Sequence, residues 1–258
     1  MQTMLSPSEL SKNQIDRLGD RLRAGDISDD DLRLLDTYRR SFSDAYETVV
    51  GQIRDRLVLE PTGRPAKSTT SIIDKLQRES IRLSQMQDIS GCRLTVADLM
   101  DQDEVVRKLM MLFAKATVVD RRDRPSHGYR AVHVIVEVDE RVIEIQVRTS
   151  LQHLWAEVSE KLSDMVDPAI KYGGGGDVSV SFLAPASHKI MFLELTECEL
   201  RHVLASARDN DVASSVTKQK IAEARELLSS RKGNVIKLLN LLRDLAPQLK
   251  VPHDDFSN

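Results

Sequence analysis

Hydrophobic and polar residues alternate along residues 132–149, on both sides of the acidic pair Asp139-Glu140. A period of two is typical of β-strands, and a short polar step between two such runs predicts a hairpin. If the turn holds an even number of residues, the apolar side chains of both strands share one face. That face would consist of Val132, Val134, Val136, Val138, Ile143, Ile145 and Val147. The opposite face would carry His133, Glu144, Gln146 and Arg148.

Two interpretations of this polar face are open at this point. An acid, an amide, an imidazole and a guanidinium that converge beside Gly128-Tyr129 are typical of a functional site. The same residue types also suit a solvated sheet face with a cross-strand Glu–Arg pair.

Both ends of the chain show helical periodicity. Residues 1–60 are expected to be helical, and Ser28 with Asp31 forms the pattern of a capping box. Residues 186–246 are expected to be helical throughout, with apolar stripes that suit packing on a core or on another subunit. The pattern divides the chain into an N-terminal helical arm over 1–60, a core over 61–180 and a C-terminal helical region over 181–258.

The middle of the chain mixes strands and helices, which predicts an α+β fold. Residues 60–68 contain prolines and a glycine and are expected to form a loop. The GGGG run at 173–176 lacks the GxxxxGK[ST] pattern of a phosphate-binding loop and is expected to be a flexible loop. The other expected elements are a helix capped by Thr69 or Thr70 that ends near Met86, a strand over 92–97, a helix over 101–114, a strand over 116–120 and a helix from Leu151 to Leu162.

The composition narrows the function classes. A net charge of −3 argues against a protein whose whole surface grips nucleic acid, although the basic loop Arg121, Arg122 and Arg124 stays open as a local patch. Cys92 and Cys198 lie far apart and show no metal-ligand spacing, which is typical of reduced thiols. The first residues lack a signal-peptide pattern, and no apolar run reaches the length of a membrane span. We therefore expect a cytoplasmic protein with no membrane partner.

Lys67, Ser71 and Lys75 are spaced four residues apart. On a helix that starts near Lys67 they would line one face. Ammonium and hydroxyl groups close to a helix N-terminus suit a polyphosphate ligand. The alternative is a solvated helix surface, where most lysines lie.

Two carboxylates complete the candidate chemistry. Asp88 precedes the strand expected over 92–97, and Glu144 lies on the polar face of the hairpin. Carboxylates on adjacent strands can share Mg²⁺, which takes one or two such ligands together with substrate phosphate oxygens. Basic residues, hydroxyls and an acid pair together predict phosphoryl-type transfer.

Four segments in chain order are KSTTSIIDKL, QDISGCRL, HGYRAVHV and EIQVRTSLQHLWAE. They resemble the synthetase domain of RelA/SpoT-type alarmone synthetases, over roughly residues 40–165. The resemblance implies a nucleotidyltransferase-like mixed sheet flanked by helices, in a small enzyme that lacks the family's HDxxED hydrolase signature. It also implies transfer of the β,γ-pyrophosphate of ATP to the ribose 3′-hydroxyl of GDP or GTP, which gives ppGpp or pppGpp and AMP.

The resemblance assigns roles to the residues singled out above. Asp88 and Glu144 resemble the family's Mg²⁺-binding acids, and Glu144 also resembles a group that helps to deprotonate the 3′-hydroxyl. Lys67, Ser71 and Lys75 resemble the contacts to the ATP phosphates.

Further roles concern the two bases and the acceptor. Arg64 and Arg93 resemble the guanidinium pair that sandwiches adenine, although Arg64 stands one position further from Lys67 than the family pattern has it. The acceptor side is then Tyr129, which resembles the ring that stacks on guanine, with His133 and Gln146 as further contacts and Arg124 as a candidate for the acceptor phosphates.

Alternatives to this function stay open. Toxic relatives pyrophosphorylate the tRNA 3′ end or make adenosine alarmones, so tRNA and adenosine nucleotides are alternative acceptors. A catalytically idle nucleotide-binding module is an alternative of another class, which the presence of Asp88, Glu144 and Tyr129 disfavours. Short enzymes of this kind often assemble through terminal helices, so we expect a homo-oligomer.

Overall fold

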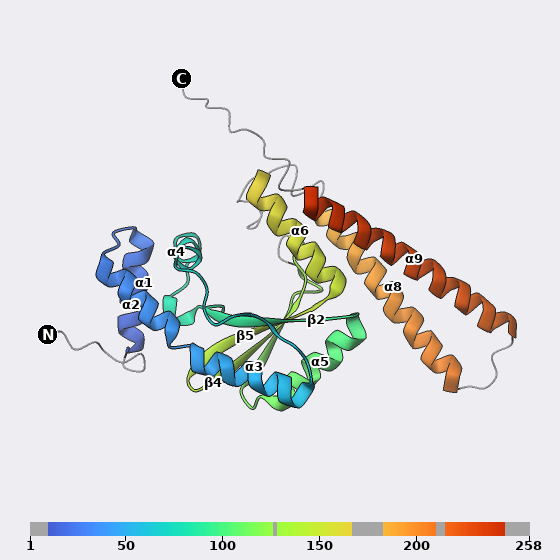
Figure 1. Cartoon of the computed structure of the whole chain (residues 1–258), viewed down its shortest axis with the longest axis horizontal. Helices are drawn as coiled ribbons and strands as arrows, with labels where there is room; N and C mark the ends of the chain where they lie inside the picture. The colour runs from blue at the N-terminus through green and yellow to red at the C-terminus, as the bar shows by residue number, and fades with distance from the viewer. Residues whose placement is uncertain (1–9, 126–127, 167–182, 210–214, 246–258) are drawn as a thin grey trace, which may run out of the picture. The chain divides into compact units, whose positions relative to one another are not determined.

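The computed structural model describes residues 10–125, 128–166, 183–209 and 215–245. Helices and strands alternate through the middle of the chain, and long helices follow (Figure 1). In chain order the elements are α1 (Lys12–Ala24), α2 (Asp29–Arg40), α3 (Ser43–Leu57), β1 (Thr62–Arg64), α4 (Thr69–Arg78), the 3₁₀ turn η1 (Leu83–Gln85), β2 (Ser90–Val96), α5 (Leu99–Leu112), β3 (Ala116–Asp120), β4 (Val132–Val138), β5 (Arg141–Thr149), α6 (Ser150–Val166), α8 (Ala184–Asp209) and α9 (Ser215–Leu245).

The chain forms two compact units. The first comprises residues up to Leu94 together with Val106–Val119 and His133–Val147, and so holds α1 to α4 and most of the sheet. The second comprises Thr95–Val105, Asp120–Val132 and the chain from Arg148 onward, and so holds α6, α8 and α9. The expected α+β class, with a mixed sheet, flanking helices and helical arms, is confirmed.

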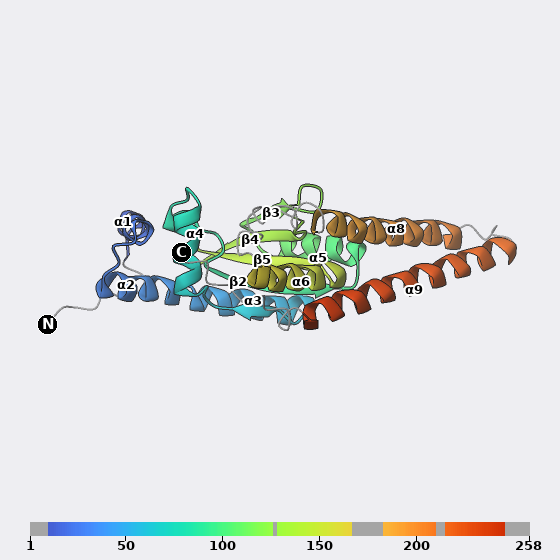
Figure 2. The same cartoon turned by 90° about the horizontal axis from the view of Figure 1, so that it is seen from above.

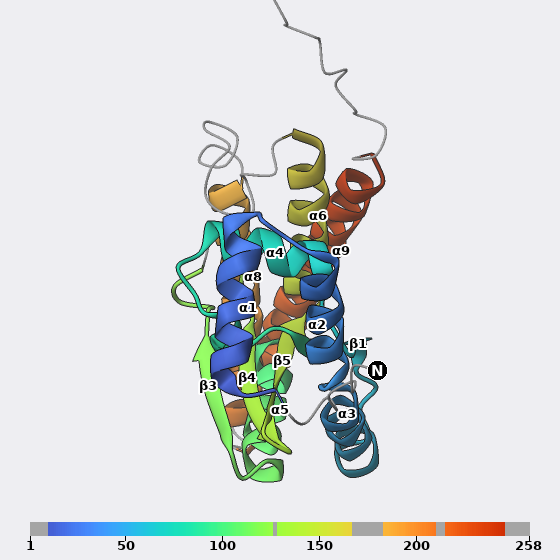
Figure 3. The same cartoon turned by 90° about the vertical axis from the view of Figure 1, so that its left-hand side faces the viewer.

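Five strands form the sheet in the order β1-β2-β5-β4-β3, and β3, β4 and β5 can be followed side by side in Figure 3. Tyr46 of α3 lies near Cys92 of β2. Burial raises the pKa of Tyr46, and the nearby Cys92 thiol raises it further. Burial raises the pKa of Cys92 itself to about 12. The strand order places β2 beside β5, so the segment after Asp88 runs next to the strand that carries Glu144.

β1 is a strand within the loop expected over 60–68, so that expectation was wrong for Thr62–Arg64. It pairs antiparallel with β2, with Gly63 opposite Cys92. The backbones approach closely there, since a Cβ on Gly63 would lie 2.5 Å from the carbonyl oxygen of Gly91. Three residues between prolines are too few to produce a periodic pattern.

The hairpin predicted from the alternation is confirmed. β4 and β5 are joined by Asp139 and Glu140, whose φ angles of 48° and 58° are left-handed, as a two-residue turn between twisted strands requires. The apolar face is buried, with Val134 and Ile145 both at 0% exposure. On the polar face, His133 and Glu144 are also buried, at 8% and 9% exposure. His133 and Glu144 are therefore not part of a solvated surface.

Two helix boundaries differ from those expected. Ser68 caps α4 in place of Thr69 or Thr70, and its hydroxyl accepts a hydrogen bond from the backbone of Ser71. The helix ends at Arg78, well before Met86. Arg23 of α1 lies at this end of the helix, where its guanidinium donates to the carbonyl oxygen of Leu76 in the last turn and to that of Ile81 beyond the helix.

The second unit is a helical assembly. α6, α8 and α9 pack on one another, and Figures 1 and 2 show α8 and α9 as two long helices inclined to each other. Where the structure describes them, residues 186–246 are helical as expected; residues 173–176 and 210–214 lie outside the described residues. Among the described helices, none has both the length and the apolar composition to cross a membrane. The buried core of this unit is formed by Leu151, Leu154, Trp155, Val158, Leu183, Ile190 and Leu239.

Candidate active site

Asp88 is held by two lysines in the first unit. Lys67 Nζ donates to Oδ2 at 2.7 Å and Lys75 Nζ donates to Oδ1 at 2.9 Å, and all three side chains are at least three-quarters buried. Lys67 precedes the cap Ser68, whereas Lys75 lies in the last turn of α4. The backbone of Lys67 is fixed as well, since its N–H donates to Ile89 and its carbonyl accepts from Arg39. Lys67 thus lies before α4 and not on its face as expected, but its ammonium group meets that of Lys75 on the Asp88 carboxylate.

The lysines determine the charge state of Asp88. Burial raises the pKa of this carboxyl, but the charges and hydrogen bonds of Lys67 and Lys75 outweigh burial and leave the pKa below its usual value. Asp88 is therefore ionised at neutral pH, and the three groups together carry one net positive charge. A cluster with that charge attracts anions such as phosphate.

Glu144 forms a second buried acidic group in the same unit. Its Oε1 lies 2.8 Å from His133 Nδ1, and its Oε2 accepts a hydrogen bond from Gln146 Nε2 at 2.7 Å. Burial raises the pKa of Glu144, whereas His133 and Gln146 lower it, and the net result is a pKa below the usual value. The negative charge of Asp88 acts in the raising direction, which shows that the two carboxylates interact electrostatically.

Gly91 lets β2 and β5 approach each other beneath Glu144. A Cβ at this position would lie 2.5 Å from the carbonyl oxygen of Glu144 and 3.3 Å from its Cβ. Backbone cannot move away as the end of a long side chain can. The glycine therefore fixes how closely the strand that bears Glu144 lies to the strand that follows Asp88.

We expect Gly91→Ala to destabilise the protein by about 1–3 kcal/mol, because the added methyl group overpacks the strand pair. Gly51→Ala is the matched control, since a Cβ there meets nothing within 4 Å in the middle of α3. This control should gain about 0.5–1 kcal/mol from helix propensity. Urea denaturation of both variants measures the difference, and equal stabilities would contradict the close approach.

The remaining donor-side residues lie on neighbouring elements of the first unit. Ser71 is in the first turn of α4, where its hydroxyl accepts a hydrogen bond from Ser68 Oγ at 2.7 Å. Arg64 belongs to β1 and is paired in register with Gly91, and Arg93 of β2 is paired with Thr62. The two arginines predicted to sandwich adenine thus come from adjacent strands.

Tyr129 belongs to the second unit and is joined there by Arg148. The Tyr129 hydroxyl accepts a hydrogen bond from Arg148 Nη2 at 2.9 Å, and the guanidinium carbon lies 4.9 Å from the ring centroid. This contact covers one side of the ring with a cation. Sequence reasoning placed Arg148 on the polar face but gave it no role; its position two residues after Gln146 was the only signal.

Tyr129 lies shortly before the hairpin, whose first strand β4 begins at Val132. Tyr129 follows Gly128, whose φ of 83° lies in the left-handed region that glycine adopts without strain. Arg124 lies on the exposed loop that follows β3.

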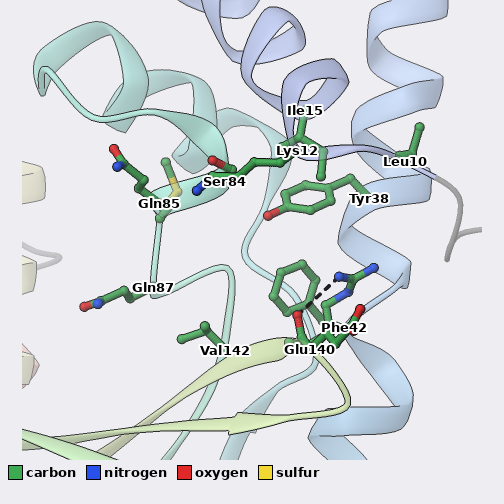
Figure 4. Close-up of a pocket in the computed structure, with 12 residues that line it drawn as sticks. Leu10, Lys12, Ile15, Tyr38, Phe42, Ser84, Gln85, Gln87, Glu140 and Val142 are labelled. Atoms are coloured by element: carbon green, nitrogen blue, oxygen red, sulfur yellow. Dashed lines mark hydrogen bonds between the residues drawn. The ribbon is translucent and has the colours of Figure 1, made fainter.

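A cavity of about 600 Å³ opens in the first unit near the hairpin turn (Figure 4). Tyr38 of α2 and Phe42, the N-cap residue of α3, form part of its wall, and the Arg141 guanidinium lies 5.6 Å from the centroid of the Phe42 ring. Burial raises the pKa of Tyr38 to about 12, so this hydroxyl stays protonated. The lining includes none of the residues predicted from sequence for the site, although Gln87 directly precedes Asp88.

Comparison with known families agrees with this geometry. Residues 63–163 match the family model described as "Region found in RelA / SpoT proteins". The chain carries the RelA/SpoT region. Every residue that the sequence pointed to as a site residue lies inside it, whereas α8 and α9 lie outside.

Individual relatives point in the same direction. An uncharacterized protein of Mycobacterium tuberculosis is 36% identical over 126 residues, which are 47% of this chain and 46% of that protein. The GTP pyrophosphokinase YjbM of Bacillus subtilis is 32% identical over 117 residues, which are 40% of this chain and 54% of that protein. The chain thus spans about half the length of the curated relatives it matches.

A solved structure supports the fold. The crystal structure of the small alarmone synthetase 1 from Bacillus subtilis superposes with a TM-score of 0.51 at 25% sequence identity. The match covers 69% of this chain and 100% of that chain. The resemblance inferred from the four sequence segments is therefore confirmed for the RelA/SpoT region and for its fold.

Proposed function

We propose that the protein is a pyrophosphokinase that transfers the β,γ-pyrophosphate of ATP to the ribose 3′-hydroxyl of GDP or GTP. Two carboxylates of the first unit carry the proposal: Asp88, which is mostly buried and held between Lys67 and Lys75, and the buried Glu144. Such a group suits phosphoryl chemistry, in which positioning and charge stabilisation provide most of the catalysis. The family match over residues 63–163 supports the same reaction class.

On the donor side, the lysines are expected to exchange partners. Lys67 and Lys75 now share one carboxylate, and a triphosphate offers each ammonium a more highly charged acceptor. Ser71 stands near the N-terminus of α4, where backbone N–H groups also attract anions. Arg64 and Arg93 would hold adenine between their guanidinium planes.

Lys75→Ala is expected to weaken the binding of a non-hydrolysable ATP analogue by about 10- to 100-fold, because it removes one charge-assisted hydrogen bond. The choice of acceptor should not change. Lys115→Ala is the matched control, since Lys115 forms an exposed ion pair with Glu137. Calorimetric titration of both variants measures the affinities, and an unchanged value for Lys75→Ala would place the donor phosphates elsewhere.

The two carboxylates fit Mg²⁺. Both are buried and ionised, they interact electrostatically, and oxygen ligands suit this ion. No group of three or more metal-ligating side chains occurs within the described residues, but Mg²⁺ with a nucleotide needs only one or two carboxylates besides phosphate oxygens and water. Asp88 and Glu144 would hold the ion, which supplies charge stabilisation to the transferring phosphoryl group.

On the acceptor side, the Tyr129 ring, which Arg148 contacts on one face, would stack on guanine. The 3′-oxygen of the acceptor attacks the β-phosphorus of ATP, the bond from that phosphorus to the α,β-bridging oxygen breaks, and AMP leaves. Glu144 accepts the hydroxyl proton, while His133 and Gln146 hold its carboxylate in place. Because the pKa of Glu144 is low, it is a weak base, and the proton should move late, when the new bond is well formed.

Arg124 is the candidate for the acceptor phosphates, from an exposed loop. Its neighbour Arg122 is already engaged by Asp120 at 2.6 Å and Asp103 at 2.7 Å. The basic loop therefore offers fewer cations to a tRNA acceptor than its sequence indicates.

One experiment tests the function and its alternatives together. The protein is incubated with Mg²⁺ and γ-labelled ATP, and separately with GDP, GTP, adenosine nucleotides or bulk tRNA. Label in a guanosine product together with stoichiometric AMP supports the proposal. Label only in tRNA or in an adenosine product changes the acceptor, and ATP binding without any transfer indicates an idle nucleotide-binding module.

A further inference from the structure

The carbonyl oxygen of Gly128, the residue before Tyr129, accepts two hydrogen bonds from two different helices. Trp155 Nε1 of α6 donates to it at 3.0 Å, and Ser187 Oγ of α8 donates at 2.7 Å. Both side chains are buried, at 2% and 1% exposure. A Cβ on Gly128 would lie 3.3 Å from the Cβ of Ser187, so α8 lies directly against this backbone.

The same hydroxyl also holds the residue after Tyr129. Arg130 Nε donates to Ser187 Oγ at 3.0 Å, and another nitrogen of this guanidinium donates to the carbonyl of Arg122. Arg130 is 3% exposed, and its burial lowers the pKa of the guanidinium. Ser187 thus fixes the chain on both sides of Tyr129, as a donor toward Gly128 and as an acceptor from Arg130.

A second polar residue of α8 supports the other partner of Tyr129. Glu194 lies two turns after Ser187, is 4% exposed, and accepts hydrogen bonds from the Thr149 hydroxyl and from Gln152 Nε2. Thr149 directly follows Arg148, which contacts the Tyr129 ring. α8 therefore contacts both sequence segments that determine where the ring stands.

Packing alone does not explain these polar groups. A buried hydroxyl or carboxylate costs free energy unless it is hydrogen-bonded, and apolar residues such as Ile190 and Leu193 already provide the packing of α8 in this unit. Ser187 and Glu194 lie where α8 meets the segments that contain Tyr129 and Arg148. α8 also lies outside residues 63–163, so the family match assigns it no role.

We propose that Ser187 is a positioning residue for the acceptor base, through which α8 holds the Tyr129 ring in its stacking orientation. This inference rests on the proposed function of Tyr129. According to this inference, acceptor affinity depends in part on the C-terminal helical region, whereas ATP affinity depends on residues of the first unit.

Ser187→Ala tests the inference because it removes both hydrogen bonds and keeps the Trp155 bond to Gly128. We expect the acceptor KM to rise about 5- to 10-fold, as for the loss of one or two buried hydrogen bonds, with the KM for ATP unchanged. Thr196→Ala is the matched control, since the Thr196 hydroxyl of α8 is exposed and bonds only within its own helix to Phe192. It should leave both KM values unchanged.

Two further measurements separate positioning from general stability. In a Tyr129→Ala background, Ser187→Ala should have no additional effect on the acceptor KM, because the ring it positions is gone. Trp155 is the only tryptophan of the chain and bonds to Gly128, so its fluorescence reports GDP binding without turnover. GDP affinity by this signal should fall by the same 5- to 10-fold factor as in the kinetic assay.

The proposal is overturned if Ser187→Ala raises both KM values equally, if it lowers only the melting temperature, or if its effect persists without Tyr129. If the wild-type protein transfers pyrophosphate to no acceptor, the proposed function fails. In that case, amide hydrogen exchange at residues 128–131 still tests whether Ser187 holds this segment in place. If it does, these amides exchange faster in Ser187→Ala than in Thr196→Ala.

Discussion

Asp88→Asn and Glu144→Gln are each expected to reduce pyrophosphate transfer by a factor of about 100 or more. Each variant removes a carboxylate that would hold Mg²⁺ beside the reacting phosphates, and the loss of one electrostatic contact in an enzyme typically costs a factor of about 10²–10³ in kcat. Glu144 is buried and Asp88 is mostly buried, held between Lys67 and Lys75. Steady-state assays at saturating Mg²⁺ and both nucleotides measure the effect.

The control for this pair is Glu137→Gln, which removes a carboxylate from the neighbouring strand β4, where Glu137 is exposed and pairs with Lys115. It should keep near wild-type turnover. Asp88→Asn also leaves Lys67 and Lys75 facing a neutral amide, so circular dichroism must accompany the assay. A folded Asp88→Asn or Glu144→Gln variant that turns over at the wild-type rate would remove that acid from the mechanism.

Tyr129→Ala is expected to raise the KM for the acceptor by about 10- to 100-fold, because stacking of a base on an aromatic ring is worth roughly 1–3 kcal/mol. The KM for ATP should stay within a factor of about two, well below the size of a lost stacking contact. Tyr129→Phe keeps the ring and loses the hydrogen bond from Arg148 Nη2, so a much smaller rise is expected. Initial-rate kinetics with varied GDP and fixed ATP provide the comparison.

A packing role for Tyr129 gives a different result. If the ring only filled space beside Arg148, Tyr129→Ala would melt at a lower temperature and keep its acceptor KM. If only transfer to tRNA responded to the substitution, the acceptor class would change. Differential scanning calorimetry beside the kinetic assay separates these outcomes.

Local patterns were sufficient for much of the architecture. The alternation around Asp139-Glu140 defined the hairpin and sorted Glu144 from Ile145, because a two-residue period and a two-residue turn leave only one register. The capping box at Ser28 and Asp31 is formed as its pattern predicts. Both signals lie within a few residues of the structure that they specify.

Long-range contacts explain what local patterns missed. At the end of α4, Arg23, more than fifty residues away in the chain, donates to the carbonyl groups of Leu76 and Ile81, a contact that no local pattern indicates. Lys67 and Lys75 meet on Asp88, 21 and 13 residues further along the chain. Residue spacing within one helix cannot predict such a contact between separate segments. The contact of Arg148 with Tyr129 likewise joins residues on two different segments.

The two cysteines provide a practical consequence for following the protein in solution. Cys92 is buried in the sheet with a pKa raised to about 12, so thiol reagents should react with it slowly while the fold is intact. Cys198 is only partly buried and lies on α8, one helical turn beyond Glu194. A maleimide dye added to the folded wild-type chain should therefore attach selectively to α8. Such a single-label sample would place a spectroscopic reporter on this helix without any engineered substitution.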